Sequence, residues 1–138
     1  MIVLKSDQLC VEFQTLGGAL SSIKDKEGVE YLWQGDPTYW SGQAPVLFPI
    51  CGSVRNDTVL YDKEDGSQKE GKIPRHGLVR KKEFTLVEQT DNSVTFAIED
   101  DEEMYANYPY HFRLEITYTV TGKTIRTQYK IYNKESEK

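Results

Sequence analysis

Apolar and polar residues alternate with a period of two along most of the chain, and helical periodicity is almost absent. The clearest case runs from Phe112 to Val120, where every second residue is apolar and the residues between them are polar. This alternation predicts a strand with one buried face. Residues 121–123 include a glycine and predict a turn, after which residues 125–131 alternate again as a returning strand.

The same pattern predicts further strands upstream. We expect them at residues 9–14, 19–24, 29–33, 84–88 and 94–98, separated by turns rich in glycine, aspartate and asparagine. Two segments break the alternation. Residues 36–40 predict a short helical turn with Pro37 just inside an aspartate cap, and residues 101–105 predict another that ends before Pro109.

Short strands joined by regular turns favour an all-β fold, an antiparallel β-sandwich formed as a single domain by residues 1–138. A chain of 138 residues is long enough to bury a core. The last predicted strand is apolar on one face, and no later segment is available to cover its edge. Because an open edge normally requires a partner strand, a homodimer through exposed edge strands is one expectation.

Composition narrows the class of partner. The net charge is −5 and the pI is about 5.1, which argues against a nucleic-acid partner because phosphate binding needs a basic surface. No apolar run approaches the length of a membrane span, and the apolar N-terminal residues are too few for a signal peptide. These features predict a cytoplasmic protein with no membrane partner.

The cysteines and acidic residues predict no metal site. Cys10 and Cys51 lie among apolar residues and are expected to be buried free thiols, although a disulfide between them stays open. Two histidines and two cysteines are scattered without zinc spacing. The acidic run 99–103 lacks the ligand spacing and glycine of a calcium loop, so we interpret it as a solvated turn.

His76 is the first candidate for chemistry. It lies in a loop between Pro74 and Gly77, where proline stiffens the approach and glycine permits close backbone contact. An imidazole there can donate to a sugar hydroxyl or act as an acid or base near neutral pH. The alternative is a surface histidine in a turn. His111 alternates with the apolar face of its strand and is expected to point outward as a cross-strand partner.

Arg55 is the second candidate. It follows the apolar segment 44–52 and precedes Asn56, and its planar guanidinium suits adjacent sugar hydroxyls or a phosphate. The alternative is a solvent-facing arginine paired with Asp57. Trp33 can stack on a pyranose face, with core packing as the alternative.

In order along the chain, these segments resemble the aldose 1-epimerase (galactose mutarotase-like) family, in particular its LacX-like branch. The matching segments are Gly17-Gly18-Ala19, residues 32–37, residues 44–52, Pro74-Arg75-His76-Gly77, Tyr108-Pro109-Tyr110 and the strand 112–120. No single motif is decisive, but six in family order make chance similarity improbable. Leu78 departs from the phenylalanine usual in the branch, which changes a packing residue.

The resemblance implies part of a β-supersandwich that interconverts the α and β anomers of a hexose without a cofactor. It implies that Arg55 binds the sugar, six residues before the aromatic Tyr61, and that His76 hydrogen-bonds the sugar and supports the chemistry, with Asn56 and Trp33 as further sugar-binding candidates. The family's second histidine, substrate-binding aspartate and glutamate base would all follow residue 138. The chain therefore resembles an N-terminal half, and we expect it to be inactive alone.

Three other readings stay open. The chain can be a non-catalytic carbohydrate-binding or regulatory module that uses the same residues. It can belong to a phosphosugar epimerase in which Arg55 contacts the phosphate. It can also be a fragment that pairs through its final strand into a dimer.

Overall fold

The computed structural model describes residues 1–136 and consists almost entirely of antiparallel strands. A three-stranded sheet contains β1 (Ile2–Lys5), β2 (Leu9–Gln14) and β3 (Ala19–Asp25), and a two-stranded sheet contains β4 (Thr58–Asp62) and β5 (Gln68–Lys72). A four-stranded sheet has the order β6 (Thr85–Gln89), β7 (Ser93–Glu99), β8 (Phe112–Thr121) and β9 (Thr124–Asn133). Within residues 1–136 there are two short helices, η1 (Arg55–Asp57) and α1 (Glu102–Asn107). The predicted all-β antiparallel fold is confirmed.

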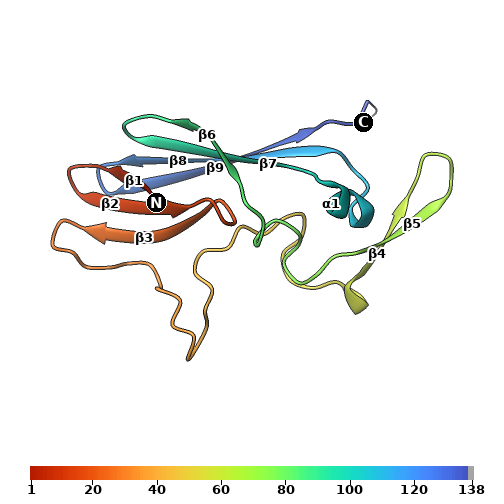
Figure 1. Cartoon of the computed structure of the whole chain (residues 1–138), viewed down its shortest axis with the longest axis horizontal. Coiled ribbons are helices and arrows are strands. Elements are labelled where there is room, and N and C mark those ends of the chain that lie inside the picture. The colour runs from red at the N-terminus through yellow and green to blue at the C-terminus, as the bar shows by residue number, and fades with distance from the viewer. Residues whose placement is uncertain (137–138) are drawn as a thin grey trace.

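The core lies between the first and last of these sheets. Figure 1 shows β1–β3 beneath one half of the β6–β9 sheet, with the β4–β5 hairpin standing at the other end. Phe13 of β2 packs against Phe96 of β7 and Tyr118 of β8, with ring centroids 6.2 and 5.0 Å away. The Tyr118 hydroxyl donates to the Gly18 carbonyl at 2.9 Å, so this large buried ring leaves no polar atom unpaired.

The strongest sequence patterns are confirmed. Burial alternates without a break along β8, and β8 and β9 pair in register over their full lengths. Asp36 accepts two backbone hydrogen bonds in the predicted helical turn, and the Asp101 carboxylate caps α1 by accepting from the Met104 N–H at 2.8 Å. No helix among the described residues is long and apolar enough to cross a membrane.

The strand predicted at residues 29–33 is wrong. The segment forms an isolated bridge between Glu30 and Lys24 and then leaves the sheet. The Glu30 carboxylate accepts from the backbone N–H groups of Ile23 and Leu32 at 2.8 and 2.9 Å, so a side chain satisfies donors that a strand ladder would use. Conversely, the sequence pattern missed β1 and the β4–β5 hairpin.

The expected burial of the cysteines is also wrong. Both are free thiols, but Cys10 is half-buried and Cys51 is exposed. Val11 and Phe13 of β2 are the residues that face the core, so Cys10 points to the other side of the strand. Cys51 lies in a loop, where apolar neighbours in sequence do not imply burial.

Candidate functional site

Two loops that carry the predicted site residues lie side by side. His76 N–H donates to the Gly52 carbonyl at 2.7 Å, and Ile73 N–H donates to the Asp57 carbonyl at 2.8 Å. Arg55 lies between these two attachments on one loop, and His76 lies at the end of the other. The β4–β5 hairpin connects the loops and holds their ends together. The structure therefore brings the segments of Arg55, Asn56 and His76 together.

His76 is held in a strained backbone conformation. Its φ is +70°, a region that residues other than glycine seldom occupy and that is enriched at functional sites. The next residue, Gly77, forms a parallel bridge with Phe48, and Leu78 N–H donates to the Phe48 carbonyl at 2.7 Å. The apolar segment 44–52 thus holds the His76 loop through these backbone contacts, and the buried Val46 anchors that segment in the core.

The hydrogen bonds of the His76 ring determine which nitrogen is available. The Gly52 N–H donates to His76 Nδ1 at 3.0 Å, so in the neutral ring the proton sits on Nε2. The Arg75 Nε–H is also directed at His76 Nε2, 3.2 Å away. A neutral imidazole has one acceptor nitrogen, and we assign it to Nδ1 because the Gly52 contact is shorter and comes from the backbone. The half-buried imidazole can donate from Nε2 to an oxygen of a ligand when the exposed Arg75 side chain turns aside.

Arg55 and Asn56 are exposed at the start of the hairpin. Asn56 and Asp57 have φ values of +55° and +51°, so the chain turns sharply directly after Arg55. Among residues 1–136 the Arg55 guanidinium forms no ion pair, and the predicted alternative of a pair with Asp57 is not seen. The five N–H donors of Arg55 are thus directed to solvent, where a hydroxyl-rich or anionic ligand can accept from them.

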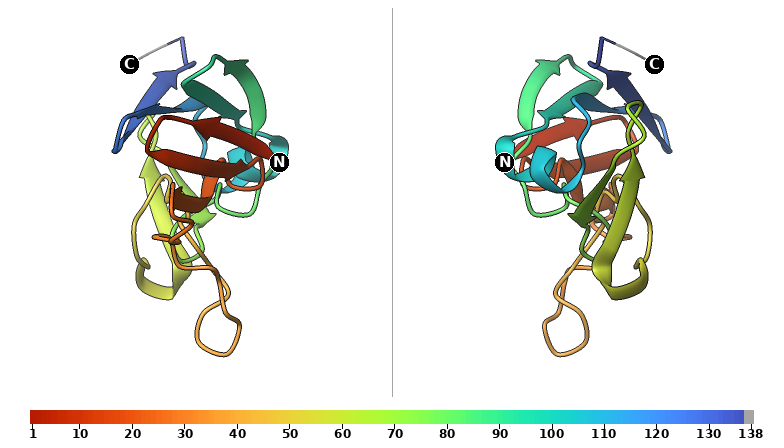
Figure 2. Two further views of the ribbon diagram at one scale, coloured as in Figure 1. Left: turned by 90° about the vertical axis from the view of Figure 1, so that its left-hand side faces the viewer. Right: turned by 90° about the vertical axis from the view of Figure 1, so that its right-hand side faces the viewer.

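Trp33 lies on a different part of the molecule. It belongs to the long loop that follows β3, and Figure 2 shows this loop projecting away from the sheets. Its indole N–H donates to the Trp40 carbonyl at 2.8 Å, and its ring meets Tyr39 edge-on. Trp33 is 42% exposed, so it is not a core residue, but these contacts are within its own loop.

Tyr61, the aromatic residue matched six positions after Arg55, is a packing residue. Its ring is buried edge-on against Tyr108 and Tyr110, with centroids 6.0 and 5.8 Å away. Burial raises the pKa of Tyr61 to about 12, so its hydroxyl stays protonated at neutral pH. This aromatic cluster attaches the β4–β5 hairpin, which begins directly after Arg55, to the loop that follows α1.

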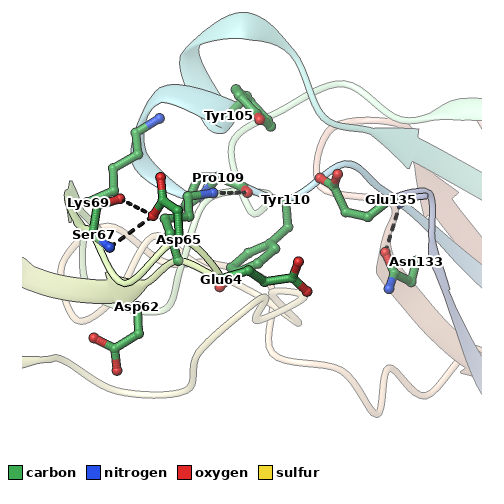
Figure 3. A pocket seen from close by; sticks show the side chains of 11 residues that line it. Asp62, Glu64, Asp65, Ser67, Lys69, Tyr105, Pro109, Tyr110, Asn133 and Glu135 are labelled. Atoms are coloured by element: carbon green, nitrogen blue, oxygen red, sulfur yellow. Dashed lines mark hydrogen bonds between the residues drawn. The ribbon is translucent and has the colours of Figure 1, made fainter. Parts of the chain in front are cut away.

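A cavity of about 730 Å³ lies between the turn of the β4–β5 hairpin, the loop after α1 and the end of β9 (Figure 3). Tyr105 and Tyr110 contribute aromatic rings to it, but the ammonium groups of Lys69 and Lys63 already lie over these rings at 5.1 and 5.4 Å. Neither Arg55 nor His76 lines this cavity. We therefore do not place the sugar site there. Among the described residues, no three His, Cys, Asp or Glu side chains cluster as a metal site.

His111 has a structural role, as the sequence suggested. It is exposed, its Nδ1 lies 2.7 Å from the Asp100 carboxylate, and its ring stacks on Tyr105 with a centroid distance of 4.3 Å. Burial opposes ionisation of Asp100, but hydrogen bonds from His111 and from the Phe112 N–H outweigh it and hold the pKa of Asp100 below its usual value. The acidic run 99–103 is therefore more than a solvated turn. Asp101 caps α1, and Asp100 accepts from the Phe112 N–H of β8, so hydrogen bonds from this run link α1 to β8.

Asp100→Asn is expected to lower the free energy of unfolding by about 1–2 kcal/mol at pH 7, because it removes a charge-assisted acceptor. A lowered folded-state pKa stabilises the protein above the unfolded-state pKa of about 3.9, and that contribution is lost as pH falls through the folded value. The variant should therefore lose less stability than the parent between about pH 5 and pH 2. Urea unfolding across that range measures this. Asp91→Asn, in the exposed β6–β7 turn, is the control, and an equal acid loss in the Asp100 variant and the parent would refute the argument.

Comparison with known proteins agrees with this arrangement of strands and loops. The family model described as aldose 1-epimerase matches residues 1–138. The chain therefore belongs to the aldose 1-epimerase family. The LacX protein encoded on the chromosome of Lactococcus lactis subsp. lactis is 58% identical over 137 residues, which are 99% of this chain and 46% of that protein. The plasmid-encoded LacX protein of the same organism is 57% identical over the same share of each chain.

Solved structures show the same fold. A galactose mutarotase related enzyme from Lactobacillus acidophilus superposes with a TM-score of 0.92 at 28% identity, over 99% of this chain and 44% of that one. A galactose mutarotase-like protein from Lactobacillus casei superposes with a TM-score of 0.89 at 27% identity, over 99% and 45%. The chain thus spans about half the length of the relatives it matches.

Proposed function

We propose that this chain carries the sugar-binding half of an aldose 1-epimerase-like site. The observation that carries the proposal is the pair of loops joined by hydrogen bonds, which place the Arg55 guanidinium and the His76 imidazole on neighbouring backbone segments. Sugars offer hydroxyl and ring oxygens as acceptors, and these groups are donors. Asn56 adds a further amide beside Arg55. Trp33 can stack on the sugar only if its loop moves toward these residues.

The proposed reaction interconverts the anomers of a hexose. A base removes the proton of the C1 hydroxyl while an acid protonates the ring oxygen, the ring opens, and closure from the other face inverts the anomer. These are proton transfers, so no cofactor is required. His76 accepts from the Gly52 N–H at Nδ1, so once Arg75 turns aside its Nε2 is suited to donate and not to act as the base. We propose that the acid and base come from sequence equivalent to the remaining half of the relatives, and that the chain alone binds without catalysing. A cytoplasmic location is part of this proposal.

Titration with galactose and glucose, followed by NMR of the chain, tests the binding half. His76→Ala and Arg55→Ala are each expected to weaken binding by about 10-fold or more, because each removes a hydrogen bond to the ligand, and one from a charged group is worth about 1.5–3 kcal/mol. Lys26→Ala, in the exposed turn after β3, is the control. Polarimetry of the isolated chain should show mutarotation no faster than buffer. Faster exchange would contradict the half-site, and binding unchanged in both variants would contradict the site.

A non-catalytic carbohydrate-binding module is the second candidate, favoured by the exposure of Trp33 and Arg55. It predicts saturable sugar binding with no anomer exchange even when the remaining half of a relative is supplied. Comparing free with phosphorylated hexoses tests the phosphosugar reading, since a phosphate contact to Arg55 would favour the phosphorylated form and be lost in Arg55→Ala.

A further inference from the structure

Each ring nitrogen of His76 faces a donor. The Gly52 N–H lies 3.0 Å from Nδ1, and the Nε–H of Arg75 is directed at Nε2, with 3.2 Å between the two nitrogens. A neutral imidazole has one acceptor nitrogen, and an imidazolium has none. Only one of the two donors can therefore be bonded at a time, while the other faces an N–H of the ring. The two possible arrangements differ in which nitrogen of His76 carries the proton.

The donor from Gly52 is fixed by the backbone. The Gly52 carbonyl accepts from the His76 N–H at 2.7 Å, so the same two residues are joined by a second hydrogen bond. The segment that carries Gly52 is also attached beyond His76, where the Leu78 N–H donates to the Phe48 carbonyl at 2.7 Å. The Gly52 N–H cannot turn away from the ring without breaking these contacts. It favours the tautomer with the proton on Nε2.

The donor from Arg75 belongs to a side chain that can leave. Arg75 is exposed, and within residues 1–136 its guanidinium forms no ion pair. A long side chain of this kind loses much rotamer freedom when it is held in one place. Its charge strengthens the hydrogen bond to His76, which offsets part of that loss. The Arg75 contact is therefore reversible, and it favours the opposite tautomer, with the proton on Nδ1.

The two arrangements differ in what Nε2 of His76 offers to a ligand. When Arg75 is bonded to Nε2, this nitrogen is an acceptor, and the Nε atom of Arg75 lies at the distance where an oxygen of a ligand would lie. When Arg75 turns aside, Nε2 carries the proton and can donate. The ligand and the guanidinium therefore exclude each other at Nε2.

We propose that Arg75 is a positioning residue that controls His76, because it biases the tautomer of the ring and occupies the ligand position at Nε2. In the chain without ligand, the ring exchanges between an arrangement bonded to Arg75, which cannot donate from Nε2, and one bonded to Gly52, which can. A sugar oxygen selects the second arrangement. The effect on sugar binding rests on the proposed function, whereas the effect on the tautomer concerns the chain without ligand.

¹⁵N NMR of the histidine rings at about pH 8.5, where a free imidazole is neutral, measures the tautomer directly. The chain contains two histidines, and His111→Gln identifies the His76 signals by removing the others. The parent is expected to show both tautomers in exchange. Arg75→Met keeps the apolar stem but removes the donor, and it is expected to show the Nε2–H tautomer alone. Arg126→Met, at an exposed position of β9, is the matched control and should behave as the parent does.

Titration with galactose measures the consequence for binding. Removal of the competing guanidinium raises the fraction of chains that can donate from about one half to nearly all, so Arg75→Met should bind galactose about twofold more tightly. Arg126→Met should leave the affinity unchanged. The gain should be absent when His76→Ala is present as well, because Arg75 acts through the imidazole.

The outcomes separate this inference from the sugar site itself. An equal tautomer ratio in the parent and in Arg75→Met would overturn it. Weaker galactose binding by Arg75→Met would make Arg75 a direct ligand contact and would also overturn it, as would a gain that persists in the His76→Ala background. If the tautomer changes but galactose does not bind, the proposed sugar site is refuted, while the control of the His76 proton by Arg75 stands.

Discussion

Gly77→Ala is expected to lower the free energy of unfolding by about 2–5 kcal/mol and to abolish sugar binding by the loop that carries His76. A Cβ atom on Gly77 would lie 2.0 Å from the Phe48 carbonyl oxygen and 2.3 Å from its carbon. Both are backbone atoms held by the Leu78 hydrogen bond, so neither can move without separating the two segments. The φ of Gly77 is +85°, which adds strain for any residue with a side chain.

Gly66→Ala separates the steric cost from the backbone cost. Gly66 has a φ of +81°, almost the same as Gly77, but a Cβ there would meet no atom within 4 Å. It should cost only about 1–2 kcal/mol, the left-handed backbone penalty alone. Urea unfolding followed by tyrosine and tryptophan fluorescence measures both variants, and NMR titration with galactose measures binding. Equal destabilisation by the two variants would show that the contact with Phe48 does not hold the loop.

The strands that could be predicted are those in which apolar residues are buried and the polar residues between them are more exposed. β8 alternates over ten residues and lies in the middle of the sheet, so each apolar side chain finds a core position. β5 gave no such signal, because its residues 68–72 are polar or glycine and it is held by pairing with β4 and by Gly71 packing on Asn107. A strand of that kind is specified by its neighbours and not by its own pattern.

The site was predictable in part for a similar reason. Glycine and proline punctuation marked the loops of Arg55 and His76, and their chemistry suggested a polar ligand. The Gly52 N–H that orients the imidazole comes from 24 residues away, and no local pattern reports such a contact. Nor did the sequence separate Trp33 from these loops, because distance along the chain does not show which way a long loop projects. The relative positions of site residues therefore depend on tertiary contacts that only the fold supplies.

Phe96→Ala is expected to cost about 3–5 kcal/mol, because Phe96 is 0% exposed and contacts both Phe13 and Tyr118. These two rings belong to different sheets, so the cavity left by the truncation lies at the joint between the sheets. A protein of ordinary stability has only about 5–15 kcal/mol to lose. We expect the variant to be marginally folded and to unfold in one cooperative step, as our proposal of a single domain requires.

Leu60→Ala is the matched control for the loss of a large apolar side chain, because Leu60 is 58% exposed on β4 and lies outside the core. It should change the free energy of unfolding by no more than about 0.5 kcal/mol. Calorimetry and urea unfolding provide the comparison. Two separate transitions in the parent or in Phe96→Ala would mean that the β1–β3 sheet and the β6–β9 sheet unfold independently. In that case the Phe13, Phe96 and Tyr118 contacts would not couple them, and the loops of the sugar site would depend on the larger sheet alone.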